Sequence, residues 1–155
     1  MTGSERLDAA ACNASPSREQ TGYAIFQQKC ARCHQEPLFT DFSYRNTGMA
    51  LDTTLNDYGR MRITGRKEDS LKFRVPSLRN VFLTFPYGHD GRFITISEVL
   101  EHYNSGIIPG PTLDSSLRKG IPISENDRFY LISFLATLTD SLFIRNPLYL
   151  SLIHI

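Results

Sequence analysis

The spacing of apolar residues predicts a first helix that begins at about Glu19. Tyr23, Phe26 and Cys30 follow one another at intervals of three and four residues, which places them on one face of a helix. We expect this face to pack against the core of the protein.

Two capping boxes predict two further helices. Thr95 and Ser124 are each followed three residues later by an acidic residue, a pattern in which side chain and backbone cap the start of a helix reciprocally. The predicted helices run over residues 95–104 and 124–138. Four apolar residues are predicted to line one face of the second helix: Phe129, Ile132, Leu135 and Leu138.

The rest of the chain has no sustained helical or strand period. Residues 35–72 contain several Gly, Asp and Asn residues, which indicates loops around short helical turns. Pro76 is well placed for a first helical position and predicts one or two turns over residues 75–81. We therefore expect an all-α domain with long loops over residues 19–145.

The two ends of the chain lie outside this predicted domain. Residues 1–18 are rich in Ser, Ala and Asn, and we expect a disordered linker or a truncated N-terminal segment there. Residues 146–155 are predicted to be a tail, whose last five residues resemble translated adapter sequence rather than native protein.

Composition argues against two classes of function. The 17 basic and 16 acidic side chains leave a formal net charge of +1 without a long run of either sign, so a nucleic-acid partner is not expected. The longest apolar stretch, residues 129–138, has about ten residues, whereas a membrane span needs about twenty. We expect one compact domain without a membrane span.

Cys30, Cys33 and His34 form the pattern Cys-x-x-Cys-His, which is typical of covalent c-type haem attachment. Two residues between the cysteines, on a helical turn, place both thiols beneath the two vinyl groups of one porphyrin. The next residue can then turn its imidazole onto the iron, so His34 is predicted to be the proximal ligand. The expected cofactor is one covalently bound haem c.

A structural zinc or dithiol domain without haem is the competing hypothesis for these cysteines. A thioredoxin-like dithiol needs a βαβ setting, which the flanking sequence does not supply. A zinc site needs a fourth ligand, and Cys12 has no suitable partner spacing. We assign Cys12 no role.

Three further segments carry a family resemblance: Pro76-Ser77-Leu78-Arg79-Asn80-Val81, residues 84–91 (Thr-Phe-Pro-Tyr-Gly-His-Asp-Gly) and Glu101-His102-Tyr103. With the haem motif, they resemble the C-terminal domain of the bacterial di-haem cytochrome c peroxidase and MauG family over about residues 20–145. The resemblance implies a cytochrome c-like fold and a second haem in an N-terminal domain, where peroxide is reduced.

This chain contains one haem motif, so the resemblance makes it the electron-transfer half of such a protein. Its implied partners are the N-terminal haem domain of the same protein and a small electron-donor protein. A stand-alone mono-haem cytochrome c that carries electrons is the alternative function. Haem attachment implies export to the periplasm, and because residues 1–20 contain no signal peptide, we expect upstream sequence.

The candidates for the other face of the iron are Met49, Met61, His89, His102 and Tyr103. On the predicted helix, Tyr103 shares a face with aliphatic residues and points inward, whereas His102 shares a face with two glutamates and points outward. The resemblance also places Tyr103 where family members have a methionine or tyrosine ligand, so we favour Tyr103. A core tyrosine, hydrogen-bonded to a propionate or to the backbone, and ligation by Met49 or Met61 stay as alternatives.

Other roles are implied by the resemblance. It places His89 near the haem edge, where the imidazole can bond a propionate; an exposed loop histidine is the alternative. Arg79 could pair with a propionate through its planar fork, or be a surface arginine. The backbone carbonyls of Thr84 and Pro86 correspond to calcium ligands in the intact protein. Gly88 departs from the family, which usually has a larger apolar residue there.

Overall fold

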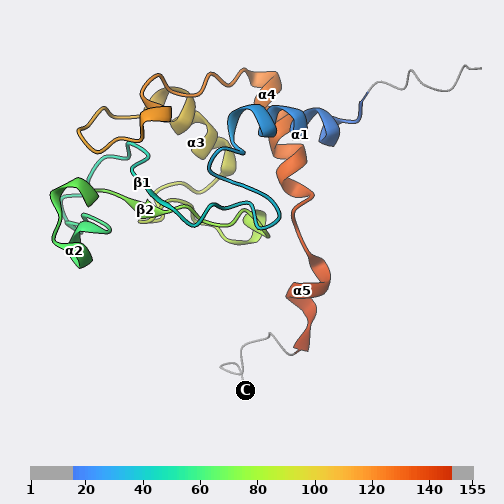
Figure 1. Cartoon of the computed structure of the whole chain (residues 1–155). Coiled ribbons are helices and arrows are strands. Elements are labelled where there is room, and N and C mark those ends of the chain that lie inside the picture. Colours follow the sequence, from blue (N-terminus) through green and yellow to red (C-terminus); the bar gives the residue numbers. More distant parts are fainter. Residues whose placement is uncertain (1–15, 148–155) are drawn as a thin grey trace, which may run out of the picture.

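The computed structural model describes residues 16–147 (Figure 1). The predictions for Cys12, for most of the N-terminal linker and for most of the C-terminal tail therefore lie outside the described residues. Helix α1 (Arg18–Lys29) confirms the first predicted helix. It begins at a capping box formed by Ser17 and Gln20, and its last turn leads into the cysteine motif at Cys30.

Both predicted capping boxes are confirmed. Thr95 caps α3 (Ile96–Glu101), which continues as the π-helix η3 (His102–Gly106), and Ser124 caps α4 (Glu125–Ala136). In each box the hydroxyl accepts from the backbone N–H three residues on, so a local interaction fixes where the helix begins. A short helix, α5 (Ser141–Arg145), follows α4.

The helices α1 and α4 pack side by side and form the centre of the core (Figure 1). Phe26 of α1 is fully buried, and its ring centroid lies 5.0 Å from that of Phe134 and 5.6 Å from that of Phe39. Leu131, also fully buried, completes this contact from α4. The haem motif thus begins where the best-packed helix ends.

The predicted buried face of α4 is partly wrong. Leu135 and Leu138 are buried as expected, but Phe129 is 50% exposed, and Leu131 and Phe134, which the prediction left out, are buried. The position of α1 decides this, because α1 packs against α4 at residues 130–134. The apolar residues of α4 form two overlapping faces, and sequence periodicity alone could not show which of the two is buried.

The all-α prediction is wrong, because the fold contains a two-stranded antiparallel sheet. Strand β1 (Tyr44–Arg45) pairs with β2 (Phe73–Arg74) in the register Tyr44 to Arg74. Strands of two residues are too short to show a period of two in the sequence, which explains the error. The mainly helical arrangement with long loops is consistent with a cytochrome c-like fold.

The loops between α1 and α3 hold only short helical pieces. They are α2 (Met61–Thr64), the 3-10 turns η1 (Lys67–Asp69) and η2 (Val81–Leu83), and a further turn, η4 (Ser115–Leu117), follows α3. The sheet and α2 lie on the opposite side of the molecule from α4 (Figure 1). No helix within residues 16–147 is long and apolar enough to cross a membrane.

The prediction of helical turns over residues 75–81 is wrong for residues 75–80, and the first helical turn there is η2, which begins at Val81. Instead, the Ser77 hydroxyl donates to the carbonyl of Leu38 at 2.6 Å, and the Arg79 guanidinium donates to the carbonyl of Pro37. These contacts with a distant loop hold the segment extended, although Pro76 suits a helical start.

Candidate functional site

The cysteine motif forms one tight turn at the end of α1. The backbone N–H groups of Cys33 and His34 both donate to the Cys30 carbonyl, at 3.2 and 3.0 Å. This turn brings Cys30, Cys33 and His34 together, as the spacing predicts. Neither of these two cysteines is in a disulfide.

Burial keeps both thiols of the motif protonated. It raises the pKa of Cys30 to about 12 and also raises the pKa of Cys33. A dithiol oxidoreductase needs a thiolate near neutral pH, so this environment argues against that function. Residues 16–147 contain no group of three or more His, Cys, Asp or Glu side chains that could hold a metal ion.

His34 has the environment of an iron ligand. Its Nδ1 lies 3.0 Å from the Phe39 carbonyl, and because a carbonyl only accepts, Nδ1 carries the proton. This tautomer leaves the lone pair of Nε2 free to bind a metal. Burial lowers the pKa of His34, opposed by hydrogen bonding to the backbones of Phe39 and Pro76, so the ring is held neutral.

Tyr103 lies close to the cysteine motif. It packs against the same core cluster as Cys30 and Ala31, and its pKa is raised to about 12 by burial and by the nearby thiols of Cys30 and Cys33. Among residues 16–147 no hydrogen bond from its hydroxyl to the backbone is found, and the alternative of a core tyrosine bonded to a propionate stays a prediction. The side chains of the motif and Tyr103 therefore fit the haem that the sequence predicts.

His102 is buried, so the prediction that it points outward is wrong. Its Nε2 lies 2.9 Å from the Thr47 carbonyl, and its ring contacts those of Phe93 and Tyr103. The predicted outer face of this helix is covered by the loop that contains Thr47. Neighbouring residues 102 and 103 both point inward, toward different partners.

Neither methionine candidate is tested by the structure. Met49 is partly buried, and its sulfur lies 3.6 Å from the place that a Cβ on Gly88 would take. That distance is an ordinary van der Waals contact, and Gly88 is required instead by its backbone, which has a φ of +88°. Met61 is the first residue of α2.

His89 is not an exposed loop histidine. Its side chain is 13% exposed, and its ring stacks on Phe73 with centroids 3.6 Å apart. Nε2 lies 3.9 Å from a carboxylate oxygen of Asp90, and burial lowers the pKa of the ring. The buried Nδ1 has no partner in this part of the chain, so it is available to a ligand. The propionate contact stays a prediction.

Arg79 has a structural role that the sequence did not reveal. It is exposed, and both Nε and Nη2 donate to the Pro37 carbonyl, at 3.0 and 2.9 Å. Its guanidinium also lies over the ring of Phe39, whose carbonyl orients His34. Arg79 therefore braces the loop that contacts His34. Thr84 and Pro86 are exposed, and the structure does not test calcium binding there.

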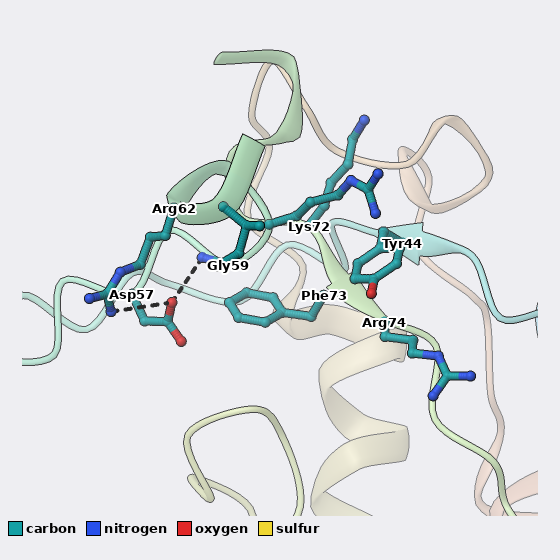
Figure 2. Close-up of a pocket in the computed structure, with 9 residues that line it drawn as sticks. Tyr44, Asp57, Gly59, Arg62, Lys72, Phe73 and Arg74 are labelled. Atoms are coloured by element: carbon teal, nitrogen blue, oxygen red, sulfur yellow. Dashed lines mark hydrogen bonds and ion pairs between the residues drawn. The ribbon is translucent and has the colours of Figure 1, made fainter. Parts of the chain in front are cut away.

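A pocket of about 530 Å³ lies between α2 and the two strands (Figure 2). Four cationic side chains line it together with the rings of Tyr44 and Phe73: Arg60, Arg62, Lys72 and Arg74. Two of these cations, Arg60 and Lys72, are paired with Asp69, and Arg62 lies 3.9 Å from Asp57. None of the predicted site residues lines this pocket.

Known proteins of similar sequence are MauG proteins and cytochrome c peroxidases, although no protein-family model matches the chain. MauG of Methylorubrum extorquens is 35% identical over 135 residues, which are 84% of this chain and 36% of MauG. Cytochrome c551 peroxidase of Nitrosomonas europaea is 38% identical over 92 residues, which are 57% of this chain and 28% of that protein. These relatives support haem c as the cofactor.

Solved structures agree with this likeness. A MauG-like protein associated with microbial copper homeostasis matches with a TM-score of 0.74 and 30% identity, over 86% of this chain and 47% of that one. The diheme peroxidase BthA of Burkholderia thailandensis shares the fold, with a TM-score of 0.63 and 22% identity over 83% of this chain and 44% of its own. In each comparison the chain spans less than half of its relative. The chain belongs to the family of MauG and the bacterial di-haem cytochrome c peroxidases.

Proposed function

We propose that this chain is the C-terminal, electron-transfer domain of a di-haem cytochrome c peroxidase or MauG-like protein. In this role it relays electrons from a small electron-donor protein to a peroxide-reducing haem in an N-terminal domain of the same protein. The observation that carries the proposal is the His34 tautomer. A ring whose Nδ1–H is bonded to the Phe39 carbonyl presents Nε2 as a ligand, directly beside two unpaired thiols.

Each residue of the site has a separate task. Cys30 and Cys33 would attach haem c through two thioethers, and His34 would ligate the iron from the proximal side. Tyr103, with its free hydroxyl, is the proposed distal ligand. The bound iron supplies reversible one-electron exchange, and the apolar cluster around Phe26 and Phe39 keeps water away from the site.

Residues at the edge of the proposed haem site would bind the negatively charged propionates of the haem. His89 would offer its unpartnered Nδ1 to a propionate, and the Arg79 guanidinium, besides its bonds to the Pro37 carbonyl, is a second candidate partner for a propionate. In the intact protein, the carbonyls of Thr84 and Pro86 would contribute to a calcium site shared with the missing domain. Because c-type haem is attached after export, we place the protein in the periplasm.

The test is expression in the periplasm of a host that attaches c-type haem, followed by a pyridine haemochrome spectrum and intact-mass analysis. We expect one haem per chain. Cys30→Ala and Cys33→Ala should each leave one thioether or none, whereas Cys12→Ser should leave the haem content unchanged. A protein that carries no haem under these conditions would refute the proposal.

A stand-alone mono-haem electron carrier is the second candidate, favoured by the single haem motif in these 155 residues. The complete gene distinguishes the two functions. A second Cys-x-x-Cys-His motif upstream in the same reading frame supports the di-haem protein, whereas a signal peptide directly before residue 1 supports the carrier.

A further inference from the structure

The turn that carries Tyr103 is a π-helix and not a regular continuation of α3. π-helical turns are rare, occur mostly as single turns and are frequent at functional sites. In η3 (His102–Gly106) the wider turn changes the direction of each side chain relative to α3. The direction of the Tyr103 hydroxyl therefore depends on what holds η3 in place.

Two sets of contacts hold η3 in place. Residues 121–123 provide two backbone N–H groups, which donate to the Tyr103 carbonyl at 2.8 Å and to the side chain of Asn104 at 3.0 Å. In the second set, Nε2 of His102 donates to the Thr47 carbonyl at 2.9 Å. His102 is thus the side chain of η3 that ties it to the loop containing residues 46–48.

The loop that accepts this hydrogen bond is itself fixed. The buried Asn46 donates to the Thr112 hydroxyl at 2.8 Å, and its carbonyl accepts from the backbone of Asp114. The Gly48 carbonyl accepts from Ile108 N–H at 2.9 Å, and at φ +74° Gly48 leaves no room for a Cβ against residues 107–108. The Thr47 carbonyl is therefore a stationary acceptor, and a bond to it sets the position of the donor.

His102 has little freedom to make any other contact. Its ring is buried, with centroid distances of 5.4 Å to Phe93 and 5.7 Å to Tyr103. Nδ1 would lie only 3.1 Å from a Cβ at Gly106, so the turn closes tightly over the ring. Because the carbonyl of Thr47 can only accept, Nε2 carries the proton.

We propose that His102 is the positioning residue that orients Tyr103 toward the haem iron, by tying η3 to the fixed carbonyl of Thr47. This inference rests on the proposed role of Tyr103 as distal ligand. His102 does not itself touch the iron, and its effect passes through the backbone that it shares with Tyr103.

The experiment compares three variants of the haem-loaded chain: His102→Leu, His102→Gln and, as a matched control, Tyr87→Phe. Leucine fills the space without a donor, whereas the glutamine amide can carry an N–H to the place of Nε2. Tyr87→Phe removes a bond of the same kind, from a core-packed ring to the Val81 carbonyl at 3.0 Å, on a segment other than η3.

The readouts are the resonance Raman bands of iron-bound tyrosinate and the reduction potential. Loss of one buried hydrogen bond shifts an equilibrium up to about tenfold. We expect His102→Leu to lower the tyrosinate-bound fraction by up to that factor and to change the potential. His102→Gln and Tyr87→Phe should keep the bands of the wild type.

Tyrosinate bands of wild-type strength in His102→Leu would overturn the inference, as would their equal loss in Tyr87→Phe. Absence of the bands from the wild type would instead remove Tyr103 as ligand, and the inference with it. If His102→Leu binds no haem, His102→Asn replaces it, because its shorter amide cannot reach the position of Nε2. Equal band intensity in the Asn and Gln variants would then overturn the inference.

Discussion

The chemical character of Tyr103 as a distal ligand bears on the redox behaviour of the site. An anionic phenolate is a hard oxygen donor that stabilises oxidised iron, whereas the thioether of a methionine favours reduced iron. Burial and the nearby thiols of Cys30 and Cys33 raise the pKa of the Tyr103 hydroxyl to about 12, so the anionic form of the proposed ligand would depend on the charge of the bound iron. A site of this kind would have a low reduction potential and would suit the storage of oxidising equivalents.

Tyr103→Met should therefore raise the reduction potential of the haem-loaded chain. The physical reason is the exchange of a hard anionic donor for a soft neutral one. Potentiometric titration of the wild type and the variant measures the shift, and Tyr103→Phe shows the effect of losing any ligand at this position. An unchanged potential in Tyr103→Met would count against ligation by Tyr103.

Arg45 on β1 links two acidic residues that are far apart in the sequence. Its two terminal nitrogens lie 2.6 Å from Asp41 and 2.7 Å from Asp114, and its Nε donates to the Ser43 hydroxyl. Burial alone would raise the pKa of Asp41, but hydrogen bonds from Ser43 and Arg45 outweigh it and lower that pKa to about 2. Removing Arg45 would leave two carboxylates facing each other without a cation.

Arg45→Met should lower the free energy of unfolding by about 3 kcal/mol at neutral pH, the usual cost of unpairing a mostly buried charge. The pKa of Asp41 is depressed, so its stabilisation is present above the unfolded value of 3.8 and is lost as the pH falls toward about 2. The difference between wild type and variant should shrink over that interval.

Urea unfolding, followed by circular dichroism at neutral and at acid pH, checks this prediction. Arg118→Met serves as the control, because Arg118 is an exposed arginine at which we expect no comparable loss. A difference between Arg45→Met and the wild type that does not depend on pH would contradict the electrostatic explanation.

At the scale of elements, the contact between α1 and α4 depends on one glycine. A Cβ on Gly22 would lie 2.0 Å from the carbonyl oxygen of Tyr130 and 2.8 Å from Cβ of Phe134. No real atom can occupy such a position, so the two helices approach each other at a distance that only glycine permits. The haem motif follows directly at the end of α1, so this approach also sets the position of the motif.

Gly22→Ala should destabilise the protein although alanine is the better helix former. The gain in helix propensity is about 1 kcal/mol, whereas overpacking of a core contact costs about 3 kcal/mol. We expect a net loss of about 2 kcal/mol in the free energy of unfolding, measured by thermal or urea denaturation. Gly110→Ala is the matched control, since a Cβ there meets nothing within 4 Å. A Gly22→Ala variant as stable as Gly110→Ala would show that the helices can move apart freely.

The elements differ in how well the sequence predicts them, and the difference follows the range of the interactions. The starts of α3 and α4 were predicted correctly because a capping box lies within four residues. The strands β1 and β2 were missed because 28 residues separate the paired Arg45 and Phe73. The prediction of helical turns after Pro76 was also wrong because of long-range contacts. Ser77 and Arg79 bind the carbonyls of residues 37–38, which are far away in the sequence.

At the scale of the whole molecule, the proposed function assigns peroxide reduction to the N-terminal domain. It therefore predicts that this chain alone reduces peroxide only weakly. Cleavage of the oxygen–oxygen bond of peroxide requires a positioned acid and base. Beside Tyr103, the nearest histidine is His102, and its Nε2 is already committed to the Thr47 carbonyl. The haem-loaded chain should therefore exchange electrons readily but turn over hydrogen peroxide slowly.

The rate of peroxide turnover is measured in the steady state with a chemical electron donor. The comparison is the same chain joined to its natural N-terminal region, which should be far more active. Turnover by the isolated chain at the rate of the longer protein would place the peroxide site within these residues, contrary to the proposal.

The sequence by itself determined the cysteine motif with His34 beside it, the starts of helices α1, α3 and α4, and the family, because each depends on neighbours within a few residues or on short motifs. Only the tertiary structure decided which residues support the site. Arg79 reaches Pro37, in the loop that contacts His34, across 42 residues, and His102 reaches Thr47 across 55. These hydrogen-bond partners depend on how distant loops pack around the helices. The local pattern of apolar and polar residues does not contain this information, so it cannot predict such contacts.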